Sequence, residues 1–145
     1  MSENVKFYAA YTATAESSIH DIWAIWVDVN NWKNWDNGIA HTEIRDSFKV
    51  GNKFSLTPQG GDPIEITLKT VTQGEEFSDE AVLPFGTIRN AHRVQAVGKK
   101  IQLTHEIHAD IDKEAAGFFA KEIWPHMQSG LPDAVNSIIS IVQED

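Results

Sequence analysis

Residues 113–142, KEAAGFFAKEIWPHMQSGLPDAVNSIISIV, carry the longest helical pattern in this chain. Their apolar side chains recur at the i, i+3, i+4, i+7 spacing that places them on one helical face. These side chains are Ala116, Phe119, Ala120, Ile123, Met127, Leu131, Val135, Ile138, Ile139 and Val142. Pro125 and Pro132 each remove a backbone donor and crowd the preceding turn, so we expect a kink or a break near each proline.

The rest of the chain predicts short strands and two small helices. Residues 5–13 alternate as a strand, Ser18 opens an amphipathic helix, and a second short helix carries Trp32 and Trp35. From residue 40 to residue 110 the apolar period is two, and the first strand of this region is expected to include Ile44 and Phe48. This order is typical of an α+β domain, in which an antiparallel sheet packs its apolar face on a helix. We therefore expect the sheet to curve around the C-terminal helix and to leave a cavity between them.

Composition narrows the functional classes. The 145 residues fit a single domain, 1–145. A net charge of −9 opposes binding to phosphate backbones, so we expect no nucleic-acid partner. The absence of cysteine excludes disulfides, thiol nucleophiles and thiolate metal sites. The sequence shows no secretory signal and no apolar run near the ~20 residues of a membrane span, which predicts a cytoplasmic location.

Two histidines have a spacing that brings them together. If Gly98 and Lys99 form a two-residue type II′ turn, Val97 pairs with Lys100 and His92 faces His105. The residues that share their face are apolar, namely Val94, Ala96, Ile101, Leu103 and Ile107, so that face is expected to be the inner one. A register shift of one residue would turn one of the two histidines outward.

Several roles are open for this histidine pair. The two rings can be structural and hydrogen-bonded, they can contact a ligand, or they can act as general acid and base near neutral pH. A metal role is disfavoured because two imidazoles are too few for zinc, so we expect no metal and no cofactor.

The predicted ligand-binding residues come from the sheet, the second short helix and the long helix. Trp32 and Trp35 are placed at a pocket mouth, with core packing as the alternative, and Phe85 lies at a constrained kink beside Pro84 and Gly86. The full predicted set is Trp32, Trp35, Phe54, Phe85, His92, His105, Phe119, Ile123 and Met127, with His92 and His105 as the catalytic candidates.

Five segments of the sequence resemble the START-like (SRPBCC) superfamily, in particular its polyketide cyclase/dehydrase-like group. These segments are 15–23, 27–35, 50–54, 98–105 and 131–134, so the resemblance extends over nearly the whole chain. It implies a helix-grip fold of about seven antiparallel strands around a long C-terminal helix, with two short helices after the first strand. It also implies an apolar cavity, which relatives use for lipid transport, hormone or alkaloid binding, polyketide cyclisation or partner regulation. The resemblance supplies no catalytic residue.

Three functions follow as hypotheses. The first is binding of a small hydrophobic or aromatic molecule between the sheet and the C-terminal helix. The second is a metal-free cyclase or dehydratase that uses the cavity histidines for acid–base chemistry. The third is a regulatory or interaction protein with a vestigial cavity, whose contact surface would include Phe118 and Trp124. We expect a monomer or a weak homodimer.

Overall fold

The computed structural model describes residues 3–143 and places strands and helices in the predicted order. The first half contains β1 (Asn4–Ala15), α1 (Ile19–Val27), the 3₁₀ helix η1 (Val29–Asn34), β2 (Ile39–Ile44), β3 (Lys53–Pro58) and β4 (Ile64–Thr72). The second half contains β5 (Glu76–Leu83), β6 (Gly86–Val97), β7 (Lys100–Asp112), α2 (Lys113–Phe118), the π-helical turn η2 (Phe119–Ile123) and α3 (Trp124–Gln143).

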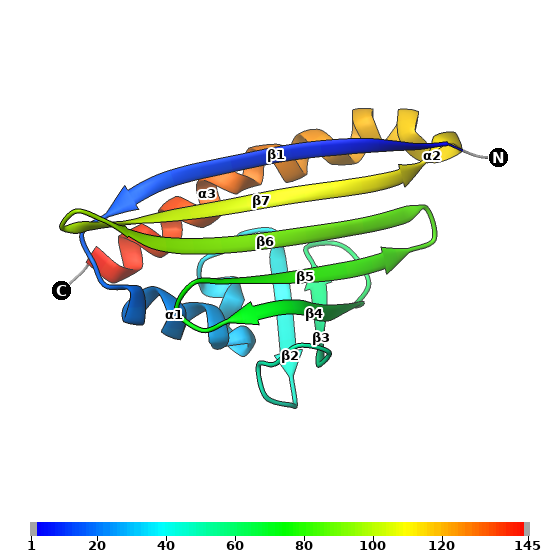
Figure 1. Ribbon diagram of the computed structural model, residues 1–145. Coiled ribbons are helices and arrows are strands. Elements are labelled where there is room, and N and C mark those ends of the chain that lie inside the picture. Colours follow the sequence, from blue (N-terminus) through cyan, green and yellow to red (C-terminus); the bar gives the residue numbers. More distant parts are fainter. Residues whose placement is uncertain (1–2, 144–145) are drawn as a thin grey trace.

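The strands within residues 3–143 form one curved antiparallel sheet of seven, in the order β1-β7-β6-β5-β4-β3-β2. The C-terminal helix lies along one face of this sheet, and α1 and η1 lie on the same side (Figure 1). This is the predicted helix-grip arrangement. One boundary differs from the prediction, because β2 ends at Ile44 and Phe48 lies in the following loop. The ring of Phe48 packs edge-on against Trp23 and Phe77, which accounts for its apolar character.

The long helix is continuous but not uniform. The π-helical turn η2 lies just before Pro125. Proline has no N–H and its ring crowds the carbonyl four residues earlier, so a widened turn accommodates it. The predicted disturbance near Pro125 is therefore present. The helix α3 continues through Pro132, so no break occurs at that proline.

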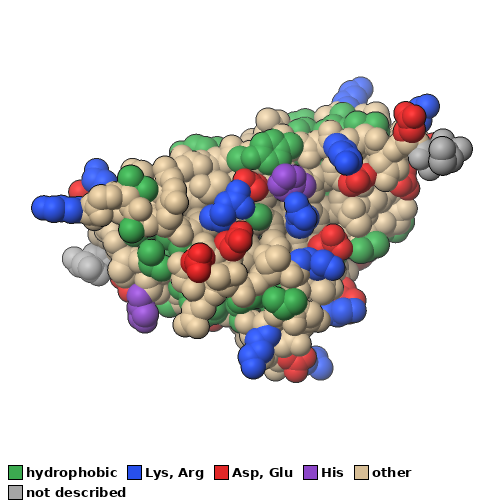
Figure 2. Space-filling view, in the orientation of Figure 1, with side chains coloured by type: hydrophobic (Ala, Val, Ile, Leu, Met, Phe, Trp, Pro, Cys, Tyr) green, Lys and Arg blue, Asp and Glu red, His purple; other side chains and the backbone are tan. Residues whose placement is uncertain are grey.

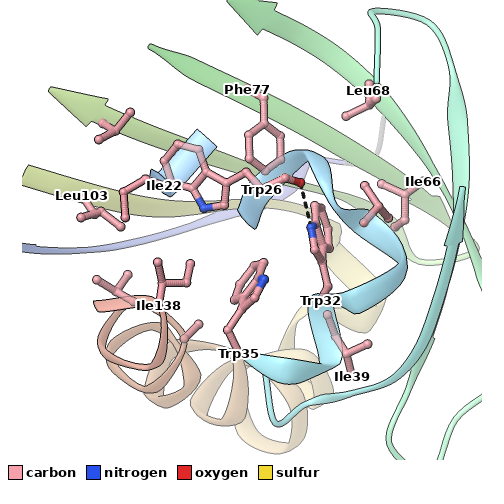
Figure 3. Close-up of a cluster of buried hydrophobic side chains, with 14 of the residues drawn as sticks. Ile22, Trp26, Trp32, Trp35, Ile39, Ile66, Leu68, Phe77, Leu103 and Ile138 are labelled. Carbon is pink, nitrogen blue, oxygen red and sulfur yellow. Dashed lines mark hydrogen bonds between the residues drawn. The ribbon is translucent and has the colours of Figure 1, made fainter. Parts of the chain in front are cut away.

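Two clusters of apolar side chains fill the space between the sheet and the helices. The larger cluster holds Trp26, Trp32 and Trp35 with residues of the sheet and of α3 (Figure 3). The indole Nε1 of Trp32 donates to the carbonyl of Trp26 at 2.9 Å, which satisfies one buried donor. The smaller cluster lies where α2 and η2 cross β1, and it contains Phe119 and Ile111.

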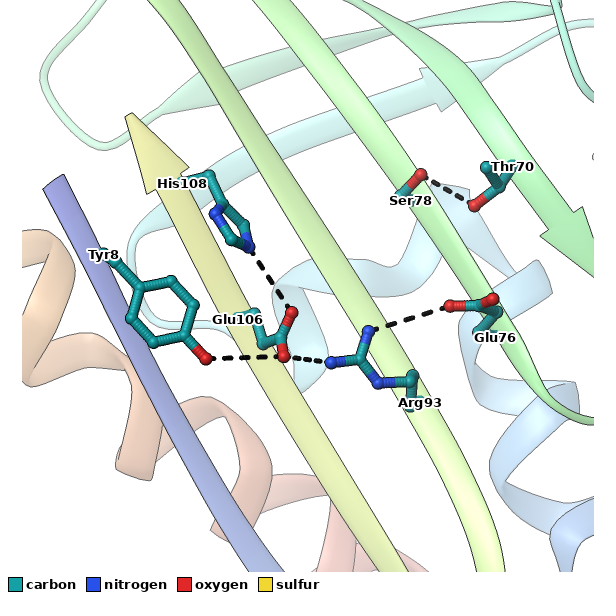
Figure 4. Close-up of polar contacts among 7 residues, drawn as sticks. All are labelled: Tyr8, Thr70, Glu76, Ser78, Arg93, Glu106 and His108. Atoms are coloured by element: carbon teal, nitrogen blue, oxygen red, sulfur yellow. Dashed lines mark hydrogen bonds and ion pairs between the residues drawn. The ribbon is translucent and has the colours of Figure 1, made fainter. Parts of the chain in front are cut away.

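The opposite face of the sheet is polar. Charged side chains of both signs are scattered over it (Figure 2). Glu106 is the centre of one network, because it pairs with Arg93, accepts from the Tyr8 hydroxyl at 3.5 Å and lies 3.4 Å from His108 Nε2 (Figure 4). Arg93 also lies 3.7 Å from Glu76 on β5. Such cross-strand pairs help to fix the alignment of neighbouring strands.

The β6–β7 turn sets the register that the sequence predicts. Val97 pairs with Lys100, and His92 lies directly opposite His105. Gly98 has a φ of 64°, and no residue other than glycine has a positive φ among residues 3–143. A positive φ at the first central position alone is the signature of a type II′ turn. The predicted histidine pairing is therefore confirmed.

Replacing Gly86 at the start of β6 tests how closely β6 and β7 approach each other. Its φ is 150°, and an added Cβ would lie 2.3 Å from the backbone oxygen of Asp110. We expect Gly86→Ala to lower the free energy of unfolding by about 2 kcal/mol or more, as measured by urea denaturation. The control is Gly117→Ala in α2, where an added Cβ meets no atom within 4 Å. It should raise the stability by about 0.5–1 kcal/mol, and equal effects of the two changes would contradict so close an approach of the two strands at Gly86.

Candidate functional site

A cavity of about 670 Å³ opens between the inner face of the sheet and the C-terminal helix. One wall is formed by β3, β6 and β7, and the other by η2 and α3. The segment that follows η1 closes a third side. The apolar lining residues are Ile39, Leu56, Pro58, Ile88, Ile107, Ile123, Met127, Leu131 and Ala134. The polar lining residues are Asp36, Asn37, Gln59, Asn90, His105, Glu122, His126, Ser129 and Asp133. A concave site that combines apolar surface with polar groups can hold a small molecule.

A row of polar side chains crosses the inner face of the sheet beside this cavity. Asp79 on β5 pairs with Asn90 on β6, and His92, two residues further along β6, pairs with His105 on β7. Asn90 and His105 line the cavity, whereas Asp79 is 4% exposed behind them. Buried polar groups of this kind must satisfy one another.

The donor and the acceptor of the hydrogen bond between His105 and Asn90 can be assigned. His105 Nε2 lies 2.8 Å from Asn90 Oδ1. Because an amide oxygen only accepts, His105 Nε2 carries the hydrogen in this arrangement. The same Asn90 side chain hydrogen-bonds to the Asp79 carboxyl group. The row therefore runs from His105 through Asn90 to Asp79.

Burial shifts the titration of all three ionisable groups toward their neutral forms. It raises the pKa of Asp79 to about 7, although the hydrogen bond from Asn90 acts in the opposite direction. It lowers the pKa of His105 to about 4. The pKa of His92 is lowered well below its usual value, first by burial and then by the neighbouring His105. Both imidazoles are therefore neutral at pH 7, and Asp79 is the group that titrates near that pH.

His92 is packed among aromatic rings. It stacks on Phe77 with ring centroids 4.4 Å apart and an interplanar angle of 8°, and the ring of His105 lies 4.0 Å away. The ring centroids of Trp26 and Trp35 lie 5.6 and 6.2 Å from that of His92. His92 is not among the residues that line the cavity. Of the two predicted catalytic candidates, His105 alone reaches the cavity.

The other predicted ligand-binding residues divide into two groups. Ile123 and Met127 line the cavity, as His105 does. Trp32, Trp35 and Phe54 belong to the larger apolar cluster. Phe119 and Phe85 belong to the smaller one. The structure therefore brings three of the nine predicted residues together at the cavity, and the remaining six form the apolar packing around it.

The prediction did not include Asp79, Asn90 or Asp36. Asp79 and Asn90 could have been found by extending the His92–His105 register to β5, which pairs Phe77 with His92 and Asp79 with Asn90. Asp36 follows η1 and lines the cavity, where its Oδ1 accepts from the backbone N–H of Gly38 at 2.9 Å. Burial raises the pKa of Asp36, and the bond from Gly38 opposes that shift.

The charged groups of the cavity are acidic. Asp36, Glu122 and Asp133 line it, together with His105 and His126, and none of its lining residues is lysine or arginine. The described residues contain no group of three His, Asp or Glu side chains placed to hold a metal ion. No helix between residues 3 and 143 is long and apolar enough to cross a membrane.

A second hollow, of about 570 Å³, lies on the outer face of the sheet. Its lining includes Lys6, Tyr8, Arg89, His108 and Asp110. It is broad and carries charges of both signs. The cavity beneath the helix has the larger apolar surface and the polar row at its wall, so we take that cavity as the candidate site.

Comparison with known proteins identifies the fold. No protein-family model matches the sequence, and no curated protein matches it. Solved structures do match. Norcoclaurine synthase from Thalictrum flavum has a TM-score of 0.75 at 15% identity, over 98% of this chain and 97% of that one. A START superfamily protein from Mycobacterium smegmatis has a TM-score of 0.73 at 12% identity, over 94% of this chain and 99% of the other.

A further structure is the di-domain ARO/CYC protein StfQ of the steffimycin biosynthetic pathway. Its TM-score is 0.79 at 9% identity, over 97% of this chain and 51% of StfQ. These similarities show that the chain shares its helix-grip fold with norcoclaurine synthase, a START superfamily protein and StfQ. At such low identities they establish the fold alone.

The buried Asp79 carboxyl group makes stability depend on pH. Its folded-state pKa of about 7 lies above its ordinary value of 3.8, so the folded protein holds this proton more tightly than the unfolded chain. The contribution is fully present below the unfolded pKa and is lost as the pH rises through the folded pKa. We therefore expect Asp79→Asn to gain stability relative to wild type, on the order of 2–3 kcal/mol, between pH 5 and pH 8.

Urea denaturation of both proteins at the two pH values measures this difference. The comparison with wild type cancels the opposite contributions of His92 and His105, which remain in both proteins. Asp62→Asn, in the exposed loop before β4, is the control and should show no such gain. A difference between Asp79→Asn and wild type that stays constant with pH would contradict the assignment.

Proposed function

We propose that this protein binds a small hydrophobic or aromatic molecule in the cavity between the sheet and the C-terminal helix. The observation that carries the proposal is the cavity itself, which has about 670 Å³ of space, a mainly apolar lining and a polar row at one wall. Binding there would remove apolar ligand surface from water, and each Å² removed contributes roughly 25 cal/mol of favourable free energy. The fold supports the proposal, since norcoclaurine synthase was solved with dopamine and hydroxybenzaldehyde bound.

The charge of the cavity restricts the ligand. Three lining residues are acidic, and no lysine or arginine lines the cavity to compensate an anion. A carboxylate ligand would lose its hydration without gaining a cationic partner. The ligand class is therefore an uncharged or cationic apolar molecule rather than a fatty acid or another organic anion.

A second candidate is an enzyme of the cyclase or dehydratase type. The observation in its favour is His105, a neutral imidazole at the cavity wall with a fixed hydrogen-bond partner. General-base catalysis requires such a group within reach of the substrate. The position of His92 among aromatic rings leaves His105 as the only member of the predicted pair at the cavity, so binding is the function that the geometry supports best.

Titration with N-phenyl-1-naphthylamine, an uncharged apolar fluorophore, tests the proposal. We expect one saturable site per chain. Met127→Trp on α3 should weaken binding at least tenfold, because the larger side chain occupies cavity volume. Val82→Trp is the matched control, since Val82 on β5 is 74% exposed and lies outside the cavity lining. Unsaturable fluorescence, or equal effects of the two variants, would reject a ligand site in this cavity.

A charge series on one scaffold tests the ligand class. 2-Naphthylmethylamine, 2-naphthylmethanol and 2-naphthoic acid differ mainly in charge at neutral pH. Displacement of the fluorophore should rank the acid last, by roughly tenfold or more, because the cavity presents three carboxyl groups. Added salt should reduce the differences in affinity among the three compounds, because it screens the charges. If 2-naphthoic acid bound most tightly of the three, the cavity would prefer anions and the proposed ligand class would be wrong.

A further inference from the structure

We propose that the cavity selects an apolar ligand bearing a hydroxyl group, a phenol or an alcohol, which donates a hydrogen bond to His105, and that Asp79 controls this preference through Asn90. The proposal rests on the proposed function, because it requires a ligand in the same cavity. Beyond that function, it specifies a hydroxyl group on the ligand and three residues that recognise it, namely His105, Asn90 and Asp79.

The acceptor character of His105 follows from its partner. Its Nε2 atom carries a hydrogen because it lies 2.8 Å from the Asn90 oxygen. A neutral imidazole has one N–H and one lone pair, so Nδ1 holds the lone pair. The ring is neutral at pH 7 because burial lowers its pKa to about 4. His105 lines the cavity. In this tautomer its Nδ1 is the acceptor that we propose a bound hydroxyl group uses, whereas a ketone or an ether has no hydrogen to donate to it.

Asp79 determines the orientation of Asn90. When Asp79 is ionised, its oxygens only accept, so the Asn90 amide must present its N–H to Asp79 and its oxygen to His105. When Asp79 holds a proton, its O–H can donate to the Asn90 oxygen. The amide then rotates, its N–H points to His105 Nε2, and the histidine hydrogen moves to Nδ1. His105 would then offer the ligand a donor in place of an acceptor.

The surroundings of Asp79 make it the member of the row that titrates. It is 4% exposed, Leu68 of β4 and Asn90 of β6 pair with it, and no charged group contributes to the shift of its pKa. The other titratable groups on the inner face are His92, His105 and Tyr11, whose hydroxyl bonds to Asn136. Asp36, Glu122, His126 and Asp133 face the cavity from the segment after η1 and from the long helix.

Three naphthalenes of similar size test the preference. 2-Naphthol donates a hydrogen bond, 2-methoxynaphthalene only accepts one, and 2-methylnaphthalene does neither. At pH 8 we expect 2-naphthol to bind roughly five- to tenfold more tightly than the other two, which is the range of one net hydrogen bond. At pH 5.5 the ratio of 2-naphthol to 2-methoxynaphthalene affinity should fall.

Single substitutions test whether His105 and Asp79 cause the preference for 2-naphthol and its pH dependence. His105→Phe should abolish the preference for 2-naphthol, and Asp79→Asn should make the affinity ratio independent of pH. His20→Phe is the matched control, because the His20 side chain on α1 is 92% exposed and is not among the cavity lining residues. It should retain both the preference and its pH dependence. Loss of the pH dependence in His20→Phe would overturn the role of Asp79.

Nitrogen chemical shifts of ¹⁵N-labelled histidine provide a readout on the wild-type protein that needs no variant to fold. We expect the Nε2–H form of His105 at pH 8 and a growing Nδ1–H form at pH 5.5. Equal affinity for all three naphthalenes at both pH values would overturn this inference and leave the proposed function intact. Failure of all three to bind would reject the proposed function itself.

Discussion

The connection at Gly98 and Lys99 fixes which side chains of β6 and β7 face the helix. Two long strands, of 12 and 13 residues, are held in one alignment by a turn of two residues. Because strand side chains alternate, a shift of one residue on one strand would move its polar side chains to the outer face. The contact between Asn90 and His105 depends on this alignment. So does the order of polar groups that leads from the cavity wall to the interior.

That alignment also explains how much of the site could be predicted from the sequence. The long helix and the His92–His105 pairing follow from local patterns, namely helical periodicity and the glycine at the turn. Asp79 does not, because apolar alternation on β5 predicts the wrong orientation: the apolar Val82 is 74% exposed, whereas the charged Asp79 is 4% exposed. A strand pattern indicates the inner face only when its apolar residues are the ones that point inward. A pairing partner on β6 was needed to orient β5.

The aromatic residues illustrate a different limit. Trp32, Trp35 and Phe54 have the composition of a ligand pocket, and the structure packs them against one another instead, with Trp32 and Phe54 rings 5.1 Å apart. Large rings fill a core and line a cavity by the same contacts, so residue type alone cannot separate the two roles. The apolar part of the cavity lining consists of aliphatic and small side chains such as Ile107 and Ala134, and no Phe, Trp or Tyr is among the lining residues. The fold is shared with proteins at 9–15% identity, so it does not by itself dictate which side chains line a cavity.

The π-helical turn at Phe119–Ile123 has a consequence for the way this sequence can evolve. A helix rotates by about 100° per residue, so the extra residue of a π-helical turn sets the phase between α2 and α3. Deletion of one codon within this turn would rotate the α2 side of the helix away from β1, or turn Met127 out of the cavity. The same deletion in the exposed loop between β3 and β4 would leave both packed faces in phase. We therefore expect this fold to tolerate a change of length in its loops and not within the π-helical turn.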